Sequence, residues 1–156
     1  MNWPRPCVRR NEPLANHTSF RIGGPADWYA EPSTMEDLLV VLRAAAAQDV
    51  PVSVMGGGTN LLVPDRGVRG LVIRLGPGFR TVEILPDDGR RTEALVRCGA
   101  AVMTQRLVSF AAQHGWDGFE LMAGLPGQVG GAVMMNAQQI GRFVERVRLM
   151  TIAGEV

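Results

Sequence analysis

The sequence predicts an α+β protein of two lobes, and three observations support this prediction. An apolar run at 52–55 leads into three consecutive glycines, which is typical of a strand that ends in a ligand-binding turn. A helical apolar stripe precedes that run, so the two belong to a β–α–β unit. Glycine and proline then interrupt both periodicities, and a hairpin pattern follows. We therefore expect an irregular arm at 1–15, a first lobe at 16–76 and a second, truncated lobe at 77–156.

Length and composition restrict the possible functions. A chain of 156 residues with 46% hydrophobic and 20% charged residues can bury a real core. A net charge of +1 gives no reason to expect nucleic acid as a partner. No apolar run approaches the roughly 20 residues that span a bilayer. Two separated cysteines and two histidines lack ligand spacing, so we predict no metal site, no membrane association and a reducing, cytoplasmic compartment.

The first lobe is predicted element by element. The turn-rich segment 16–26 precedes a short strand at 27–31, which stops at Pro32. Ser33 and Glu36 have the spacing of a capping box, which predicts a helix that begins there. The apolar stripe of this helix consists of Met35, Leu38, Leu39, Leu42, Ala45 and Ala46. Further strands are expected from Pro51 to the glycines and over 71–75.

The second lobe begins after Gly76-Pro77-Gly78, where we place the boundary. A hairpin is predicted from strands at 81–85 and 93–98 and a turn at 86–89. A helix follows, with Met103, Leu107, Phe110 and Ala111 on one face and Gly115 after its last turn. Alternation over 147–151 predicts a strand, 153–154 a turn, and 155–156 the start of another strand.

The triple glycine Gly56–Gly58 has two possible roles. Glycine lets bare backbone N–H groups approach an anion, and Thr59 and Asn60 could donate as well. The loop is not a Walker loop, because Lys is absent, and it lacks the third glycine of the Rossmann fingerprint at Leu61. A plain surface turn would also use glycines. The spacing alone leaves both a phosphate-binding turn and a surface turn open.

A second glycine series contains Gly124, Gly127, Gly130 and Gly131, among small and apolar side chains. Such spacing can let a helix or an extended segment pack against another backbone. It can equally let a flat ring or a pyrophosphate lie against the chain, and the apolar flanks suit a ring system. Two glycine-rich segments are what one large nucleotide cofactor held across two lobes would require.

Three motifs occur in order along the chain: 16–26 (NHTSFRIGGPA), 56–62 (GGGTNLL) and 123–137 (AGLPGQVGGAVMMNA). Together they resemble the amino-terminal half of bacterial UDP-N-acetylenolpyruvoylglucosamine reductase (UDP-N-acetylmuramate dehydrogenase). The resemblance implies a two-lobed FAD-binding fold of the vanillyl-alcohol-oxidase (PCMH) type, with FAD tightly bound between two α+β lobes.

The resemblance also implies a reaction. NADPH reduces the flavin, and the flavin N5 passes hydride to the enolpyruvyl group of a UDP-sugar substrate. The product, UDP-N-acetylmuramate, is a peptidoglycan precursor, so the family serves cell wall biogenesis, cell shape and cell division. The residues implied in cofactor binding are Met55, Gly56, Gly57, Gly58, Thr59, Asn60, Leu61, Gly124, Leu125, Pro126, Gly127, Val129, Gly130, Gly131, Ala132 and Asn136.

Two departures from the family pattern limit what is carried over. Gln138-Gln139-Ile140 stands where the family has Gly-Ala-Tyr, so contacts through that glycine and tyrosine are not assigned. The family's catalytic arginine, serine and glutamate would fall beyond Val156. We therefore assign no catalytic residue, expect the substrate-binding domain to be absent, and expect this chain alone to be inactive. The alternatives are the FAD-binding domain of another flavin oxidase of the same fold, and a nucleotide-binding module without a redox role.

Overall fold

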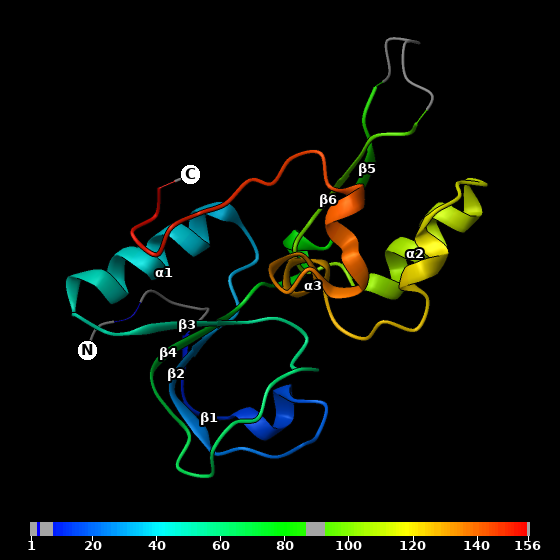
Figure 1. Ribbon diagram of the computed structural model, residues 1–156. Helices are drawn as coiled ribbons and strands as arrows, with labels where there is room; N and C mark the ends of the chain where they lie inside the picture. The colour runs from blue at the N-terminus through cyan, green and yellow to red at the C-terminus, as the bar shows by residue number, and fades with distance from the viewer. Residues whose placement is uncertain (1–2, 4–7, 87–92, 156) are drawn as a thin grey trace.

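The computed structural model describes residue 3, residues 8–86 and residues 93–155 (Figure 1). The first lobe is built on a four-stranded sheet of order β1-β2-β4-β3. Its strands are β1 (Val8–Pro13), β2 (Pro25–Ala30), β3 (Val52–Met55) and β4 (Val68–Arg74). β2, β4 and β3 run parallel, and β1 pairs with β2 in the antiparallel sense. Helix α1 (Met35–Ala47) connects β2 to β3, as the β–α–β pattern predicts.

Both faces of this sheet are covered. On one face, Ala30, Leu71 and Ile73 pack against Val41, Leu42 and Ala45 of α1. The opposite face holds a second cluster of Leu14, Ala26, Tyr29, Met55 and Val72. Strand β4 lies inside the sheet, so its residues 70–73 are buried, and Leu71, Val72 and Ile73 are all apolar. The carboxyl ends of β3 and β4 are therefore held in place by packing on both faces of the sheet.

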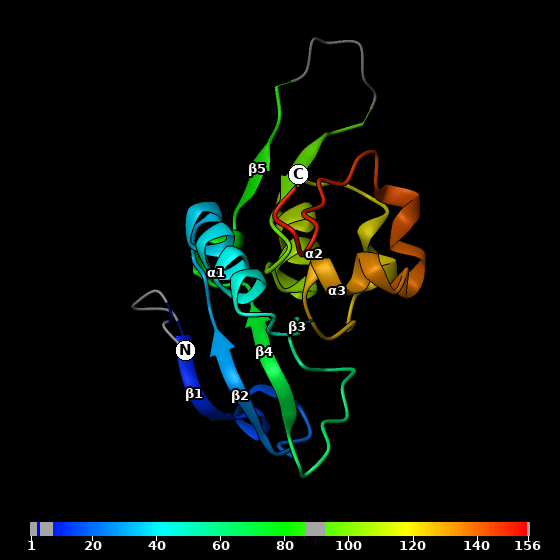
Figure 2. The same ribbon diagram turned by 90° about the vertical axis from the view of Figure 1, so that its left-hand side faces the viewer.

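The second lobe is smaller and mostly helical (Figure 2). Its elements are η2 (Pro77–Phe79), β5 (Val82–Ile84), β6 (Val96–Cys98), α2 (Thr104–Gln113), η3 (Phe119–Met122), α3 (Val129–Met134) and η4 (Ala137–Phe143). One core cluster contains Val102, Leu107 and Val129, and another contains Met122, Ala132 and Ile140. The second glycine series lies between α2 and α3 and along α3 itself.

Most predicted elements are confirmed. The strand before Pro32, the helix behind it, the strand before the glycines, the hairpin strands and the helix that precedes Gly115 are all present. Gly115 follows α2 with φ +67, the left-handed conformation that ends many helices. The hairpin turn falls largely on 87–92, which lie outside the described residues.

The prediction of an irregular arm is wrong for residues 8–15. Residues 8–13 form β1, an edge strand of the sheet, and Leu14 begins the short helix η1 (Leu14–His17). Arg9 lies over the ring of Tyr29 and Arg10 over that of Trp28, with 4.8 Å and 4.7 Å from guanidinium carbon to ring centroid. These arginines cover aromatic rings with their planar groups, so a strand that reads as polar is well packed.

The prediction of a strand at 147–151 is also wrong. These residues are irregular, and Met150 packs into the core of the first lobe beside α1. The turn that follows is confirmed, since Gly154 N donates to Thr151 O over 2.9 Å. Figure 1 shows this terminal segment returning across α1, so the described residues beyond 149 belong with the first lobe rather than the second. Val156 lies outside the described residues.

Helix α1 begins one residue later than its capping pattern predicts. Thr34, not Ser33, is the N-cap: Asp37 N donates to Thr34 Oγ1 over 3.0 Å, and Thr34 N donates to Asp37 Oδ2 over 3.2 Å. We expect Thr34→Ala to lower the free energy of unfolding by about 1 kcal/mol, because Asp37 N loses its acceptor, Thr34 Oγ1. Urea denaturation followed by circular dichroism measures this. Ser33→Ala is the control, and an equal loss for it would contradict the assignment.

Candidate functional site

The triple glycine turn lies at the carboxyl end of β3, beside the last residue of β4. Met55 pairs with Arg74 across these strands, and Gly56 follows at once. In open sheets with parallel strands, this edge is where ligands bind. Within the part of the chain that the structure describes, the backbone N–H groups of Gly57, Gly58, Thr59 and Asn60 donate to no protein acceptor. The turn thus presents a run of free donors.

The structure brings the two glycine stretches together. A Cβ atom built on Gly57 would lie 3.2 Å from Gly127 Cα, and one built on Gly127 would lie 2.8 Å from Thr59 Oγ1. Gly127 has φ +106, which favours glycine in its own right. Residues some 70 positions apart thus form one continuous surface of bare backbone, as a cofactor held by both stretches requires.

Gln128 is a residue of this surface that the sequence does not reveal. It is only 5% exposed, and its Oε1 lies 3.5 Å from where a Cβ on Gly56 would stand. Its position is fixed from the backbone, because Ala132 N donates to Gln128 O over 3.0 Å. Its side-chain amide finds no hydrogen-bond partner among the described residues. Its oxygen and nitrogen are not among the fully buried side-chain atoms that lack a partner, so the amide reaches the open surface and can bind a ligand there.

The glycines divide into two groups. Gly58 and Gly130 are required by the chain's own packing, since added Cβ atoms would lie 2.0 Å from His17 O and 2.9 Å from Ala100 Cβ. Around Gly124 and Gly131, by contrast, no described heavy atom lies within 4 Å of such an atom. Close packing against the chain itself therefore explains the glycines at positions 58 and 130. The second pair leaves room for a ligand.

The other predicted site residues occupy different surroundings. Met55, Val129 and Ala132 are buried in the hydrophobic clusters, so only their backbone could reach a ligand. Asn60, Leu61 and Pro126 are exposed, and Leu125 is half-buried. Asn136 is exposed with φ +47, and its Oδ1 accepts a hydrogen bond from Gly141 N over 3.0 Å.

The residues that depart from the family pattern after Asn136 also have an unusual backbone conformation. Gln138 and Gln139 adopt φ +51 and φ +59, a left-handed conformation that glycine accepts freely. Each glutamine there costs about 1 kcal/mol relative to glycine. The left-handed conformation alone would therefore favour glycine at position 138.

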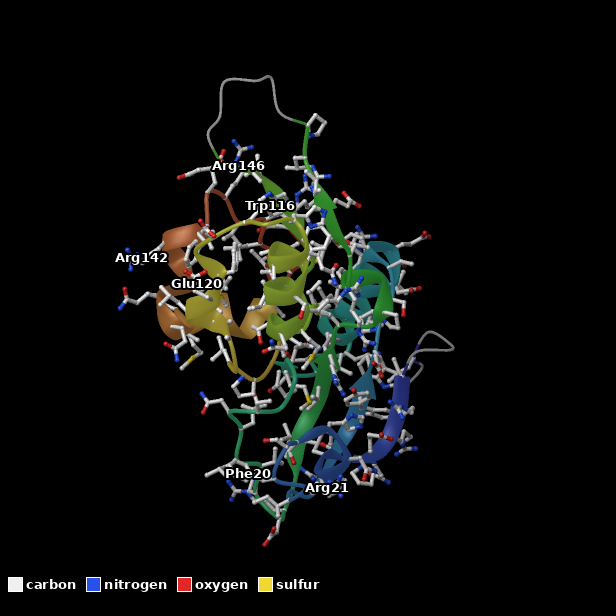
Figure 3. The ribbon with its side chains drawn as sticks, turned by 90° about the vertical axis from the view of Figure 1, so that its right-hand side faces the viewer. Phe20, Arg21, Trp116, Glu120, Arg142 and Arg146 are labelled. Atoms are coloured by element: carbon white, nitrogen blue, oxygen red, sulfur yellow. The ribbon has the colours of Figure 1, made fainter. Side chains whose placement is uncertain are left out.

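The remaining reactive side chains lie outside this surface or are unreactive. Burial raises the pKa of the Cys98 thiol to about 11, an effect that Arg106 only partly offsets, so the thiol stays protonated at neutral pH. Trp116 packs with His114 and Phe110 at the end of α2, with ring centroids 4.7 Å and 5.9 Å from its own. Figure 3 shows Trp116 at the far end of the molecule from Phe20 and Arg21.

Metal ions and membranes have no evident site in the described residues. No group of three or more His, Cys, Asp or Glu side chains among residues 3, 8–86 and 93–155 is placed to hold a metal ion. Over the same residues, no helix is both long and apolar enough to cross a bilayer.

Comparison with known families identifies the fold. Residues 26–156 match the family profile described as FAD binding domain. The chain belongs to the FAD-binding domain family. Among solved structures, this FAD-binding domain is similar to UDP-N-acetylenolpyruvylglucosamine reductase from Thermus caldophilus, with a TM-score of 0.62, 37% identity, and coverage of 83% of this chain and 41% of that one. A solvent-stable cholesterol oxidase, 18% identical with a TM-score of 0.52 over 73% of this chain and 21% of its own, shares the fold alone.

Curated relatives agree with the structural neighbour. The UDP-N-acetylenolpyruvoylglucosamine reductase of Agathobacter rectalis is 40% identical over 98% of this FAD-binding domain and 51% of its own length. That of Rubrobacter xylanophilus is 43% identical over 92% of this chain and 46% of its own. The chain therefore spans about half the length of the curated relatives that it matches. The predicted two-lobed FAD-binding fold and the family resemblance are confirmed.

Proposed function

We propose that this chain is the FAD-binding part of a UDP-N-acetylenolpyruvoylglucosamine reductase, and that the turn at Gly56–Asn60 and the segment 124–136 hold the cofactor. The observation that carries the proposal is the meeting of these two glycine stretches beside Gln128, whose amide makes no hydrogen bond to another described residue. The names of the relatives support the assignment of the enzyme.

The residues present fit the diphosphate of FAD. A diphosphate accepts many hydrogen bonds, and the free N–H groups of Gly57 to Asn60 and the amide of Gln128 can donate them. Successive backbone N–H groups can bind anions without a cationic side chain. The open surface at Gly124 and Gly131, beside the half-buried Leu125 and the exposed Met134, suits the flat, largely apolar isoalloxazine ring.

These contacts indicate which roles belong to FAD and which to the residues of this chain. FAD supplies hydride-transfer chemistry when bound. The residues of this chain would hold the diphosphate, fix the orientation of the ring and keep water from one of its faces. We assign none of them to proton transfer. Reduction by NADPH, the UDP-sugar substrate, peptidoglycan precursor synthesis with its effect on cell shape and division, and a cytoplasmic location are proposed by analogy with the relatives.

A flavin titration of the purified chain tests the proposal. We expect FAD to bind with a shifted visible absorption band and quenched fluorescence, and to bind more tightly than riboflavin, which lacks the diphosphate. We expect no NADPH oxidation that depends on the enolpyruvyl UDP-sugar. Absence of saturable FAD binding would contradict the assigned site, and substrate-dependent turnover would contradict the expectation that this chain is inactive alone.

The role of Gln128 is tested by Gln128→Leu. We expect FAD affinity to fall by about tenfold, because one hydrogen bond to a charged group is lost. Stability should not fall, since leucine is similar in volume and the Gln128 amide makes no hydrogen bond to another described residue. Gln113→Leu, on the exposed end of α2, is the matched control and should leave affinity unchanged. An unchanged FAD affinity in Gln128→Leu would remove Gln128 from the site.

A further inference from the structure

A polar cluster lies behind the glycine turn, and neither the sequence motifs nor the proposed cofactor contacts give it a role. At its centre is His17, whose side chain is 10% exposed, paired with Glu12, whose side chain is 14% exposed. His17 Nε2 and Glu12 Oε1 are 2.7 Å apart. On the other side of the ring, His17 Nδ1 lies 3.3 Å from both the Tyr29 hydroxyl and Arg74 Nη1.

These partners fix the hydrogen positions of the imidazole ring. A guanidinium can only donate, so Nδ1 of His17 must accept from Arg74, and the proton stands on Nε2, where Glu12 accepts it. The ring also stacks on Tyr29 with 4.4 Å between centroids, and Arg9 covers the Tyr29 ring in turn. His17 is therefore held by β1, β2 and β4 together, and its ring has one orientation.

The backbone of His17 contacts the glycine turn directly. A Cβ atom on Gly58 would lie only 2.0 Å from His17 O, so the two backbones are in van der Waals contact. Two residues on, Ser19 N and Ser19 Oγ donate to Gly58 O over 3.0 Å and 3.3 Å. Arg74 reaches the same turn from its other end, because it pairs with Met55 immediately before Gly56.

We propose that His17 is a positioning residue for the cofactor turn. Its ring, fixed by Glu12, Tyr29 and Arg74, holds the segment 17–19 against Gly58 and so fixes where the N–H groups of Gly57 to Asn60 point. Arg74 contributes to this link through its Nη1, which donates to His17 Nδ1 over 3.3 Å. This inference rests on the proposed function, in which those N–H groups bind the diphosphate.

The test compares His17→Phe with His17→Gln in the full 156-residue chain. Phenylalanine keeps the stacking on Tyr29 but offers no donor to Glu12 and no acceptor to Arg74. Glutamine offers both. We expect the FAD dissociation constant to rise about tenfold in His17→Phe and at most about threefold in His17→Gln. Riboflavin affinity should change by less than about twofold in either variant, because riboflavin lacks the diphosphate.

Thr34→Ala is the control, because it destabilises the chain through α1 without touching the cluster. It should leave FAD affinity within about twofold of the unmodified chain. An equal loss of FAD affinity in Thr34→Ala, or an equal loss of riboflavin and FAD affinity in His17→Phe, would show a general effect on stability and overturn the proposal. If His17→Phe does not fold, Glu12→Gln must raise the FAD dissociation constant without changing riboflavin affinity, or the proposal fails.

Amide NMR spectra of the cofactor-free chain separate this inference from the proposed function. His17→Phe should shift or broaden the signals of Gly57 to Asn60, whereas Thr34→Ala should not. If the unmodified chain binds no FAD but these signals respond, the proposed function fails while the positioning role stands. If FAD binds and the signals do not respond to His17→Phe, the positioning role fails while the proposed function stands.

Discussion

Replacing Gly58 with alanine is expected to lower the free energy of unfolding by about 3 kcal/mol or more, because two costs coincide at this position. Gly58 has φ +67, where a side chain is strained by about 1–2 kcal/mol. In addition, the new methyl group would stand 2.0 Å from His17 O, which belongs to the backbone and cannot turn aside. Relief requires the segment 17–19 to move away from the glycine turn.

Gly115→Ala separates the two costs. Gly115 has the same φ of +67, but no described heavy atom lies within 4 Å of an added Cβ. It should therefore lose only about 1 kcal/mol, the conformational part. Urea denaturation of both variants measures the difference, which reports the contact between Gly58 and His17. If Gly58→Ala costs no more than Gly115→Ala, the close contact at Gly58 is wrong. Gly58→Ala should also weaken FAD binding in whatever fraction remains folded.

The parts of the fold that depend on local pattern could be predicted from the sequence. The helix after Pro32 has an apolar stripe and a capping sequence, and both act within a few residues. Even so, Val41 is fully buried although the predicted stripe omits it, and Met35 is exposed although the stripe includes it. Burial on a helix depends on which side the sheet lies, and that is a tertiary property.

The wrong predictions for residues 8–15 and 147–151 have a common cause. Strand β1 forms because it pairs with the edge of β2, and the local sequence of residues 8–13 does not indicate that partner. Residues 147–151 alternate like a strand but pair with no neighbouring strand in the described structure. The side chain that packs against the core is that of Met150, whereas the predicted strand would have placed Val147, Leu149 and Thr151 on the buried face. Strand formation requires a partner that lies far away in sequence, so alternation alone cannot decide it.

The candidate site was predictable to a similar degree. Both glycine stretches could be identified, because glycine runs are rare and mark special backbone conformations. Which glycine faces solvent and which faces His17 or Ala100 could not be predicted, since it depends on how segments remote in sequence meet. Gln128 and His17 were missed as site residues for the same reason. A polar side chain gains its role from partners, and these lie on other strands and helices.

Replacing Gly131 with leucine is expected to weaken FAD binding about a hundredfold while leaving the fold intact, because the new side chain would occupy space that only a ligand fills. Gly131 lies three residues beyond Gln128, and residues at that spacing share one face of a helix. A Cβ added there meets no described heavy atom within 4 Å. Within α3, leucine is also the better helix former by about 0.8 kcal/mol, so stability should rise rather than fall.

The comparison that decides this prediction is between affinity and stability in the same variants. Gly131→Ala should bind FAD with an intermediate affinity, since a methyl group intrudes less than an isobutyl group. Ala112→Leu, on an exposed position of α2, adds a similar apolar side chain elsewhere and should change neither FAD affinity nor stability appreciably. A Gly131→Leu chain that is as stable as the unmodified one and binds FAD equally well would show that the cofactor does not lie along α3. Loss of affinity together with gained stability is an outcome that damage to the fold cannot produce. It would place the cofactor at the second glycine series without reference to any relative.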